Sequence, residues 1–371
     1  MWSLLLQMSE HATQRIATTM PIPEQVVDPW QLVIRLIYSS HLSLTEAIAM
    51  LPLPTQTILP QPEIREITTG LRFPEGPVWM PDGSIVLVEI EAKRLTRVAP
   101  DGKKSTVAQM SGGPNGAARG PDGMIYVTNN GGFSWREAPE GLFPTFQPPD
   151  YSGGRLERVD PATGKIETLY TACDGRGLRG PNDLVIDAHG DIYFTDLGKS
   201  RPTEIDRAGV YYAKRDGSLI RQMAGPTLTA NGCSLSPDGK ALYFAETESA
   251  RIWAIDLTVP GERKVHGFPS PNGARFVAQV GGRYQRFDSM AVDAAGNICV
   301  ATLINGGITV ISSDGQTIRF IPMPDLMTTN ICFGGQDLAT AYVTLSAGGK
   351  LVSFDWRKTI GTVGLKLNDG T

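Results

Sequence analysis

Oxygen-bearing side chains recur at a fixed distance before a series of glycine turns. These turns are "PDGSIVLVE" at residue 81, "PDGMIYVTN" at 121, "AHGDIYFTD" at 188, "PDGKALYFAE" at 237 and "AAGNICVAT" at 294. Eight residues before each turn glycine stand, in chain order, Glu75, Asn115, Asn182, Asn231 and Asp288. A degenerate sixth copy, "GGQDLATAYVT" at 334, follows Asn330, which we assign to the same position. Asn and Asp also begin strands as turn formers, but a position shared by two acids and four amides favours a shared need for an oxygen donor.

These six side chains, brought together, would form an all-oxygen metal site. A donor set without imidazole or thiolate is typical of a hard cation, Ca²⁺ before Mg²⁺ or Mn²⁺, with Zn²⁺ as a further candidate. The carboxylates of Glu75 and Asp288 would neutralise a divalent ion, and Asn carbonyls and water would complete its coordination. A cation would also explain why Glu75 heads an otherwise apolar strand, since a buried carboxylate without a partner is costly.

The repeats predict the elements that would position these side chains. Each turn is followed by a further strand-like run, such as "RLTRVAPDG" or "RLERVDPATG", and the turns lie about 40 to 67 residues apart. Six units of about four strands predict an all-β fold, a six-bladed β-propeller spanning residues 61–371. The first strand of each blade lies innermost in a propeller, so the six side chains would face one axis. The run "EIREITTG" would complete the last blade beside "KLVSFDW" and leave no open edge.

Residues 1–60 differ from the rest of the chain and predict a short helical N-terminal extension followed by a linker. Asp28 is placed to cap one helix, and Ser43 with Glu46 forms a capping box for a second. A proline-rich linker follows from Pro52 to Pro62. Such a helical pair would pack on the propeller or on a second copy of the chain, so a homo-oligomer formed through these helices is one possible assembly.

Composition limits the classes of binding partner and the cellular compartment that we expect. The chain has 371 residues, 41% of them hydrophobic, and a net charge of −4, which argues against a nucleic-acid partner. Its four cysteines form no C-x-x-C pair, which favours reduced core side chains over disulfides or zinc ligands. No basic leader and no run near the ~18 apolar residues of a membrane span are evident. We therefore expect a cytoplasmic protein with a small-molecule substrate and no membrane partner.

Four segments carry a family resemblance: "FPEGPVW", "RGPNDLVIDAHGDIYFTD", "TANGCSLSPDGKALYFAE" and "FDSMAVDAAGNICVAT". In this order they resemble the gluconolactonase, senescence marker protein and luciferin-regenerating enzyme family of six-bladed propellers, over about residues 63–356. The resemblance implies a divalent metal held by Glu75, Asn182, Asn231 and Asp288. It also implies hydrolysis of a lactone, a cyclic ester, by a metal-activated water with Asp288 as general base. Asn115 and Asn330 would orient the substrate or the water.

Other activities are compatible with the same residues. A phosphotriesterase-like enzyme, or another acid–base enzyme acting on a ring-containing metabolite, could use the same metal cup, and a non-catalytic propeller scaffold is the third alternative. Gly180 stands where gluconolactonases often carry an Arg, with Arg179 one residue earlier, so sugar recognition is open. None of the four histidines begins a strand, which argues against a histidine dyad.

Residues 129–154, "NNGGFSWREAPEGLFPTFQPPDYSGG", form a long insert that we place between blades two and three. Its aromatic residues would either line a pocket for an apolar or ring-shaped substrate or pack the insert onto the blade. We name Trp135 and Arg179, with Asn115 and Asn330, as candidate substrate-binding residues. Arg283 and Arg286, just before Asp288, could meet a substrate carboxylate or remain solvated at the surface.

Overall fold

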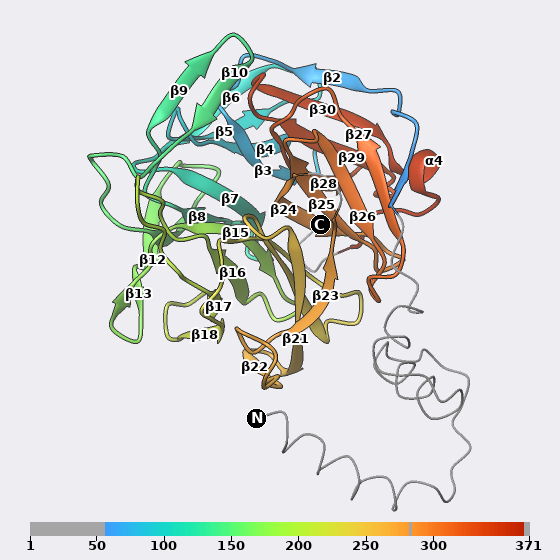
Figure 1. The fold of residues 1–371 in the computed structure, drawn as a ribbon. Helices are drawn as coiled ribbons and strands as arrows, with labels where there is room; N and C mark the ends of the chain where they lie inside the picture. The colour runs from blue at the N-terminus through green and yellow to red at the C-terminus, as the bar shows by residue number, and fades with distance from the viewer. Residues whose placement is uncertain (1–55, 282–283, 367–371) are drawn as a thin grey trace, which may run out of the picture. The chain divides into compact units, whose positions relative to one another are not determined.

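A computed structural model describes residues 56–281 and 284–366 of the chain. These residues form six sheets of mainly antiparallel strands around a central axis (Figure 1), which confirms the predicted six-bladed β-propeller and shows a mostly β fold. The predicted N-terminal helices and Arg283 lie outside the described residues.

The blades follow one another along the chain, and each contributes its first strand to the axis. From the axis outward, the strands of the first three blades are β3 (Pro74–Trp79), β4 (Ile85–Glu89), β5 (Arg94–Val98) and β6 (Lys104–Gln109); β7 (Pro114–Arg119), β8 (Ile125–Asn129), β11 (Arg155–Val159) and β12 (Ile166–Tyr170); and β15 (Pro181–Ile186), β16 (Ile192–Asp196), β17 (Val210–Ala213) and β18 (Ile220–Ala224). A small hairpin of β13 (Ala172–Cys173) and β14 (Arg176–Gly177) joins the second blade to the third.

The remaining three blades repeat this arrangement. Their strands are β19 (Ala230–Leu235), β20 (Ala241–Glu246), β21 (Arg251–Val259) and β23 (Arg275–Gln279), with β22 (Glu262–Arg263) on the end of β21; β24 (Arg286–Val292), β25 (Ile298–Leu303), β26 (Gly307–Ile311) and β27 (Ile318–Pro322); and β28 (Thr328–Gly334), β29 (Thr340–Leu345), β30 (Lys350–Asp355) and β2 (Arg65–Thr68). A short helix, α4 (Trp356–Ile360), follows β30 and is capped by Asp355.

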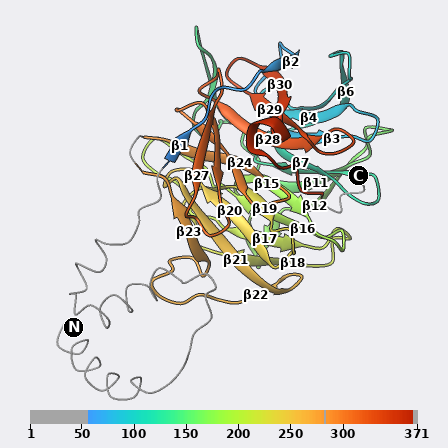
Figure 2. The same ribbon diagram turned by 90° about the vertical axis from the view of Figure 1, so that its right-hand side faces the viewer.

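Two early strands join blades from the end of the chain. Strand β2 pairs antiparallel with β30, which confirms that the segment before Glu75 completes the sixth blade and closes the ring. Strand β1 (Gln56–Ile58) pairs parallel with β27 and adds a fifth strand to blade five. Figure 2 shows β2 beside β30 and β1 beside β27. The predicted linker therefore contains a strand, because the free edge of β27 offers it backbone hydrogen-bond partners.

Hydrophobic residues fill the spaces between neighbouring blades. Six clusters of buried apolar side chains occupy the six blade–blade interfaces. The second strand of each blade contacts both neighbours; Val86, Leu87 and Val88 of β4, for example, have no exposed surface. Burial on both faces explains why these strands read as continuous apolar runs rather than as alternating patterns.

The insert lies within blade two, and its predicted place between blades two and three is wrong. Its hairpin, β9 (Trp135–Ala138) and β10 (Gly141–Pro144), comes between β8 and β11, which pair directly with each other. The spacing of turn glycines could not reveal this, since an insertion inside a blade and one between blades lengthen the same interval.

Two further expectations concern the cysteines and the membrane. All four cysteines are free thiols, in agreement with the sequence analysis. Among the described residues, no helix has the length and apolar character needed to cross a membrane.

Candidate functional site

Five of the six predicted donors meet at one end of the propeller axis. They line a cavity of about 640 Å³, hereafter the site cavity. Their exposed fractions are small: Glu75 3%, Asn115 4%, Asn182 4%, Asn231 4% and Asp288 8%. Oxygen donors from five different blades therefore face one cavity, as the repeat spacing predicts.

A β-bulge lies at or directly after each of these donors. In blade three, Pro181 pairs with Asp196 and Leu184 with Phe194, so Asn182 and Asp183 together face one residue of β16. Similar breaks in register occur near the start of β3, β7, β19, β24 and β28. A bulge re-aims a side chain out of the regular alternation, so these breaks allow polar groups to face the axis while the rest of each strand packs between blades.

In the sixth blade, Asn330 does not hold the position equivalent to the other five donors. Asn330 pairs with Thr344, as Gly116 pairs with Thr128 in blade two, so Thr329 and not Asn330 is equivalent to Asn115. The assignment by spacing is wrong by one residue because the sixth turn lacks the Asp-Gly landmark of the others. Asn330 nevertheless reaches the site, since its Nδ2 donates a hydrogen bond of 2.7 Å to Glu75 Oε2.

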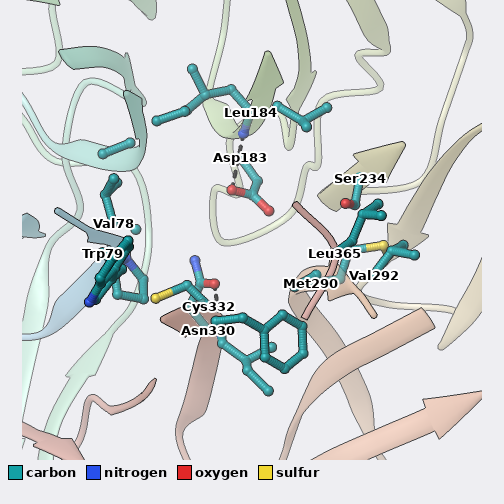
Figure 3. A pocket seen from close by; sticks show the side chains of 18 of the residues that line it. Val78, Trp79, Asp183, Leu184, Ser234, Met290, Val292, Asn330, Cys332 and Leu365 are labelled. Carbon is teal, nitrogen blue, oxygen red and sulfur yellow. Dashed lines mark hydrogen bonds between the residues drawn. The ribbon is translucent and has the colours of Figure 1, made fainter. Parts of the chain in front are cut away.

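A third buried acid, Asp183, was missed by the sequence analysis. It lines a second cavity of about 130 Å³ on the axis, hereafter the Asp183 cavity, together with Asn330, Met290 and Leu365. Figure 3 shows the Asp183 carboxylate and the Asn330 side chain in this cavity. Asp183 Oδ1 accepts a hydrogen bond from the Leu184 N–H, and Oδ2 accepts one from the Cys233 N–H of the next blade. The signal in the sequence is an acid inside the otherwise apolar strand "PNDLVI".

The three axial carboxylates lack a strong positive partner. Burial raises the pKa of Glu75, and hydrogen bonds from Asn330 and Gly76 oppose this effect. Burial, and then the charge of Glu75, raises the pKa of Asp183 to about 8 and raises that of Asp288 well above its usual range. The ion pairs formed by the described residues do not include any of the three. Carboxyl groups gathered here with little positive charge around them in the described part of the chain suit a cation-binding site.

An unpaired amide oxygen, that of Asn182, indicates whether these residues suit a metal ion. Asn182 Oδ1 is buried and has no hydrogen-bond partner among the described residues. A buried polar atom without a hydrogen-bond partner is energetically costly. A bound cation would provide the missing partner for this oxygen. Asn231 Oδ1 is only weakly engaged, by Ser289 Oγ at 3.5 Å. No group of three or more His, Cys, Asp and Glu that could hold a metal occurs in the described part of the chain. A metal bound by Glu75 and Asp288 would therefore also need the amide oxygens as ligands. The donor set as a whole fits a hard cation.

Buried polar residues at the ends of the second strands hold the segments that lead into the site. Asp196 accepts hydrogen bonds from three backbone N–H groups, those of Arg179, Gly180 and Gly198. The equivalent residues in other blades bind the backbone before their own inner strands: Glu89 accepts from Arg72 N–H, Asn129 from Gly113 N–H and Glu246 from Leu228 N–H. The repeated endings "VLVE", "YVTN", "YFTD" and "YFAE" were a signal for this set.

Neighbouring blades are also locked together at the level of the site. The Thr128 hydroxyl of blade two donates to the carbonyl oxygen of Asn182 in blade three. The Thr195 hydroxyl of blade three donates in the same way to Asn231 in blade four. These bonds fix the backbone of two candidate ligands relative to the adjacent blade.

The other two predicted substrate-binding residues do not line the site cavity. Trp135 packs against Phe73, with ring centroids 5.1 Å apart, and so fastens the insert to blade one. Arg179 is exposed, and its carbonyl oxygen accepts a hydrogen bond from the Tyr151 hydroxyl. Of the other insert aromatics, Phe143 lines the cavity, whereas Phe146 does not.

Histidine takes no part in lining either axial cavity among the described residues. His266 instead bonds Asp256 at 2.8 Å, and His189 lies in a turn, as expected. The remaining two, His11 and His41, fall outside the described residues.

Comparison with known proteins identifies the family of the chain. The model of the SMP-30/Gluconolactonase/LRE-like region matches residues 73–347, which include all five donors of the site cavity. A gluconolactonase of Zymomonas mobilis is 28% identical over 301 residues, covering 74% of this chain and 77% of that protein. Lactonase drp35 of Staphylococcus saprophyticus is 30% identical over 274 residues, covering 73% of this chain and 75% of that protein.

Solved structures share the fold. The crystal structure of a calcium-binding protein, regucalcin, from Agrobacterium tumefaciens superposes with a TM-score of 0.63 at 18% identity, covering 85% of this chain and 98% of that chain. At this identity the likeness establishes the propeller fold alone.

Proposed function

The chain belongs to the SMP-30/gluconolactonase/LRE-like family, and on this basis we propose that it is a divalent-metal-dependent hydrolase that opens the lactone ring of a small metabolite. The observation that carries the proposal is the meeting of the buried side chains of Glu75, Asn182, Asn231 and Asp288 in one cavity. Relatives named gluconolactonase and lactonase support the choice of lactone as the substrate class.

We propose that Glu75, Asn182, Asn231 and Asp288 hold the ion, with Ca²⁺ favoured by the all-oxygen donor set. A divalent ion bound there supplies Lewis-acid polarisation of an ester carbonyl and a lowered pKa for a bound water. The chain itself fixes the donors: the Asn330 amide and the Gly76 N–H both hold Glu75 Oε2, each at 2.7 Å. Asn231 Nδ2 is held by Thr247 Oγ1 at 3.0 Å.

Asp288 is our candidate general base. It is the most exposed of the five donors, at 8%, and it faces the cavity through which substrate enters. In the proposed reaction its carboxylate takes a proton from water as the water oxygen bonds to the carbonyl carbon. The ring C–O bond then breaks, the ring oxygen receives a proton, and the product is a hydroxy acid. Asn115, which lines the same cavity, would orient the substrate or the water.

A panel of lactones assayed by acid release, with and without a chelator, tests the proposal. We expect hydrolysis that the chelator abolishes and that Ca²⁺ or another divalent ion restores. Asp288→Asn should lower kcat at least about 100-fold, whereas Asp314→Asn, an exposed turn residue, should leave it unchanged.

The outcomes separate the alternatives. Cleavage of phosphotriesters without cleavage of lactones would favour the phosphotriesterase-like enzyme. Absence of both activities, together with absence of a bound ion, would favour a non-catalytic scaffold. Near-normal turnover by Asp288→Asn would remove Asp288 from the mechanism.

A further inference from the structure

We infer that the substrate carries an apolar ring or alkyl chain beside its lactone, and not the several hydroxyl groups of a sugar lactone. This inference rests on the proposed function, because it names the substrate class of the same site. It follows from the lining of the site cavity beyond the ring of oxygen donors.

The site cavity has two chemically different sides. Phe73 and Ile90 of blade one, Phe143 of the insert, and Leu326 and Met327 before β28 form an apolar wall. The opposite side, from blade four, presents Thr229, Thr247 and Glu248. A lactone whose carbonyl faces the oxygen donors would therefore lay the rest of its body against hydrocarbon.

Part of this apolar wall is open to water. Ile304 is 44% exposed and Leu326 is 38% exposed, and both line the cavity. Single exposed apolar residues are ordinary, but a concave apolar surface next to converging polar groups is typical of a ligand site. A bound apolar group would remove this surface from water.

Backbone strain marks the cavity lining as a ligand site on both of its sides, since Thr229 of blade four also has a positive φ, of 56°. Phe73 and Ile304 have φ angles of 55° and 74°, in the left-handed region that non-glycine residues seldom adopt, and both line the cavity. The conformation is especially unfavourable for a β-branched residue such as Ile304. Strain of this kind persists where the surroundings enforce it, and it gathers at ligand sites.

A sugar lactone would find few partners on this wall. Each buried hydroxyl group needs a hydrogen bond, and a site that does not supply one disfavours the ligand. Arg179 lies outside the cavity lining, and so does the neighbouring Gly180. Arg286 does line the cavity, and Glu248 binds one end of its guanidinium; its Nε, buried and without a partner among the described residues, is the one buried cationic donor left there for a substrate oxygen.

The insert also adds two charged side chains to the cavity lining. Arg136 and Glu140 are both exposed and both belong to the lining. The Arg136 guanidinium lies over the Phe143 ring, 4.8 Å from its centroid, so it covers an aromatic face rather than adding a polar contact deep in the cavity.

Three lactones with the same six-membered ring test the inference: δ-decalactone, which bears an alkyl chain, unsubstituted δ-valerolactone, and glucono-δ-lactone. Burying one methylene group adds about fourfold to binding. We therefore expect kcat/KM for δ-decalactone to exceed that for δ-valerolactone by about 10-fold or more, with glucono-δ-lactone the poorest substrate.

Two wall variants locate the effect. Phe143→Ser and Leu326→Ser should each lower kcat/KM for δ-decalactone about 10-fold and change that for δ-valerolactone less than about twofold. Phe146→Ser is the matched control, because Phe146 belongs to the same insert and is 47% exposed but does not line the cavity. Equal losses on both lactones would show a structural effect and would contradict the inference.

The inference and the proposed function fail differently. Hydrolysis of glucono-δ-lactone at least as efficient as that of δ-decalactone overturns the inference and leaves lactone hydrolysis standing. Absence of hydrolysis of all three lactones, in the presence of divalent ions, overturns both.

Discussion

Replacing Glu75 with glutamine should stabilise the metal-free protein and weaken the metal-bound one. Glu75 is 3% exposed and lies on the axis with Asp183 and Asp288. Its negative charge repels theirs and so raises the pKa of both. Its hydrogen bonds from the Gly76 N–H and the Asn330 amide can both be accepted by a glutamine oxygen. Glu75→Gln therefore removes a buried negative charge while retaining the local hydrogen bonds and the side-chain volume.

The expected magnitude follows from the cost of a buried charge. An uncompensated buried charge destabilises by about 3 to 5 kcal/mol, and the two hydrogen bonds offset part of this. We expect Glu75→Gln to raise the free energy of unfolding by about 2 kcal/mol near pH 8 in a chelator. Burial raises the pKa of Glu75, so its native-state stabilisation is present at low pH and is lost as pH rises through that pKa. The advantage of the variant should therefore fade as pH falls from about 7 to 4.5 and vanish below that range.

A divalent cation should reverse the order of stability. Ligand at about 100 times its Kd adds about 2.7 kcal/mol to the free energy of unfolding, and the wild type should gain this while Glu75→Gln gains little. Urea unfolding followed by tryptophan fluorescence, with chelator or with Ca²⁺, measures both effects. Glu167→Gln is the control, since Glu167 forms an exposed pair with Arg158 and should change the free energy by less than about 0.5 kcal/mol in either buffer. A variant that is destabilised in chelator, and that Ca²⁺ stabilises as much as wild type, would refute the reasoning.

Two further predictions concern residues around the site. Asp196→Ala leaves the N–H groups of Arg179, Gly180 and Gly198 without their acceptor and should lower the free energy of unfolding in urea by about 3 kcal/mol. The control Asp314→Ala, at an exposed position, should lower it by no more than about 0.5 kcal/mol. A loss as small as this for Asp196→Ala would contradict its positioning role. Burial lowers the pKa of Lys199 to about 7, although the charges of Asp196 and Asp206 oppose this shift. Above that pH, Lys199 still binds a proton in the unfolded chain but not in the native protein. The stability due to Lys199 therefore rises with pH. Relative to Lys199→Met, the free energy of unfolding of the wild type should rise by up to about 1.4 kcal/mol per pH unit between about pH 7 and 10. A difference between the two proteins that does not change with pH would show that Lys199 has the same protonation state in the native and unfolded chains, and would contradict the prediction.

The repeat turns allowed the propeller and most of the candidate site to be predicted. Gly83 adopts a φ of 81° and Gly123 a φ of 79°, so the turn geometry demands glycine and gives each blade a fixed landmark. Counting from that landmark works because strand length and turn length are constant in five blades. It failed at Asn330, where no Asp-Gly turn fixes the count and the register shows that Thr329 holds the equivalent place.

Contacts between distant segments could not be predicted in the same way. Asp183 follows Asn182 directly, and only the bulge in β15 shows that both side chains serve the axis, each in a different cavity. Trp135 was chosen as an aromatic residue of the insert, yet its partner Phe73 comes from a segment 62 residues earlier in the sequence. The parallel pairing of β1 with β27 likewise depends on a sheet edge that spacing does not reveal.

The central claim is that one divalent ion lies among Glu75, Asn182, Asn231 and Asp288. Anomalous diffraction from crystals grown with Mn²⁺ as a Ca²⁺ substitute locates such an ion directly. We predict a single strong peak within ligand distance of those four side chains in the wild type, absent from Glu75→Gln crystals grown in the same way. A site cavity without a peak, or an ion held instead by Asp183 in the second cavity, would contradict the account.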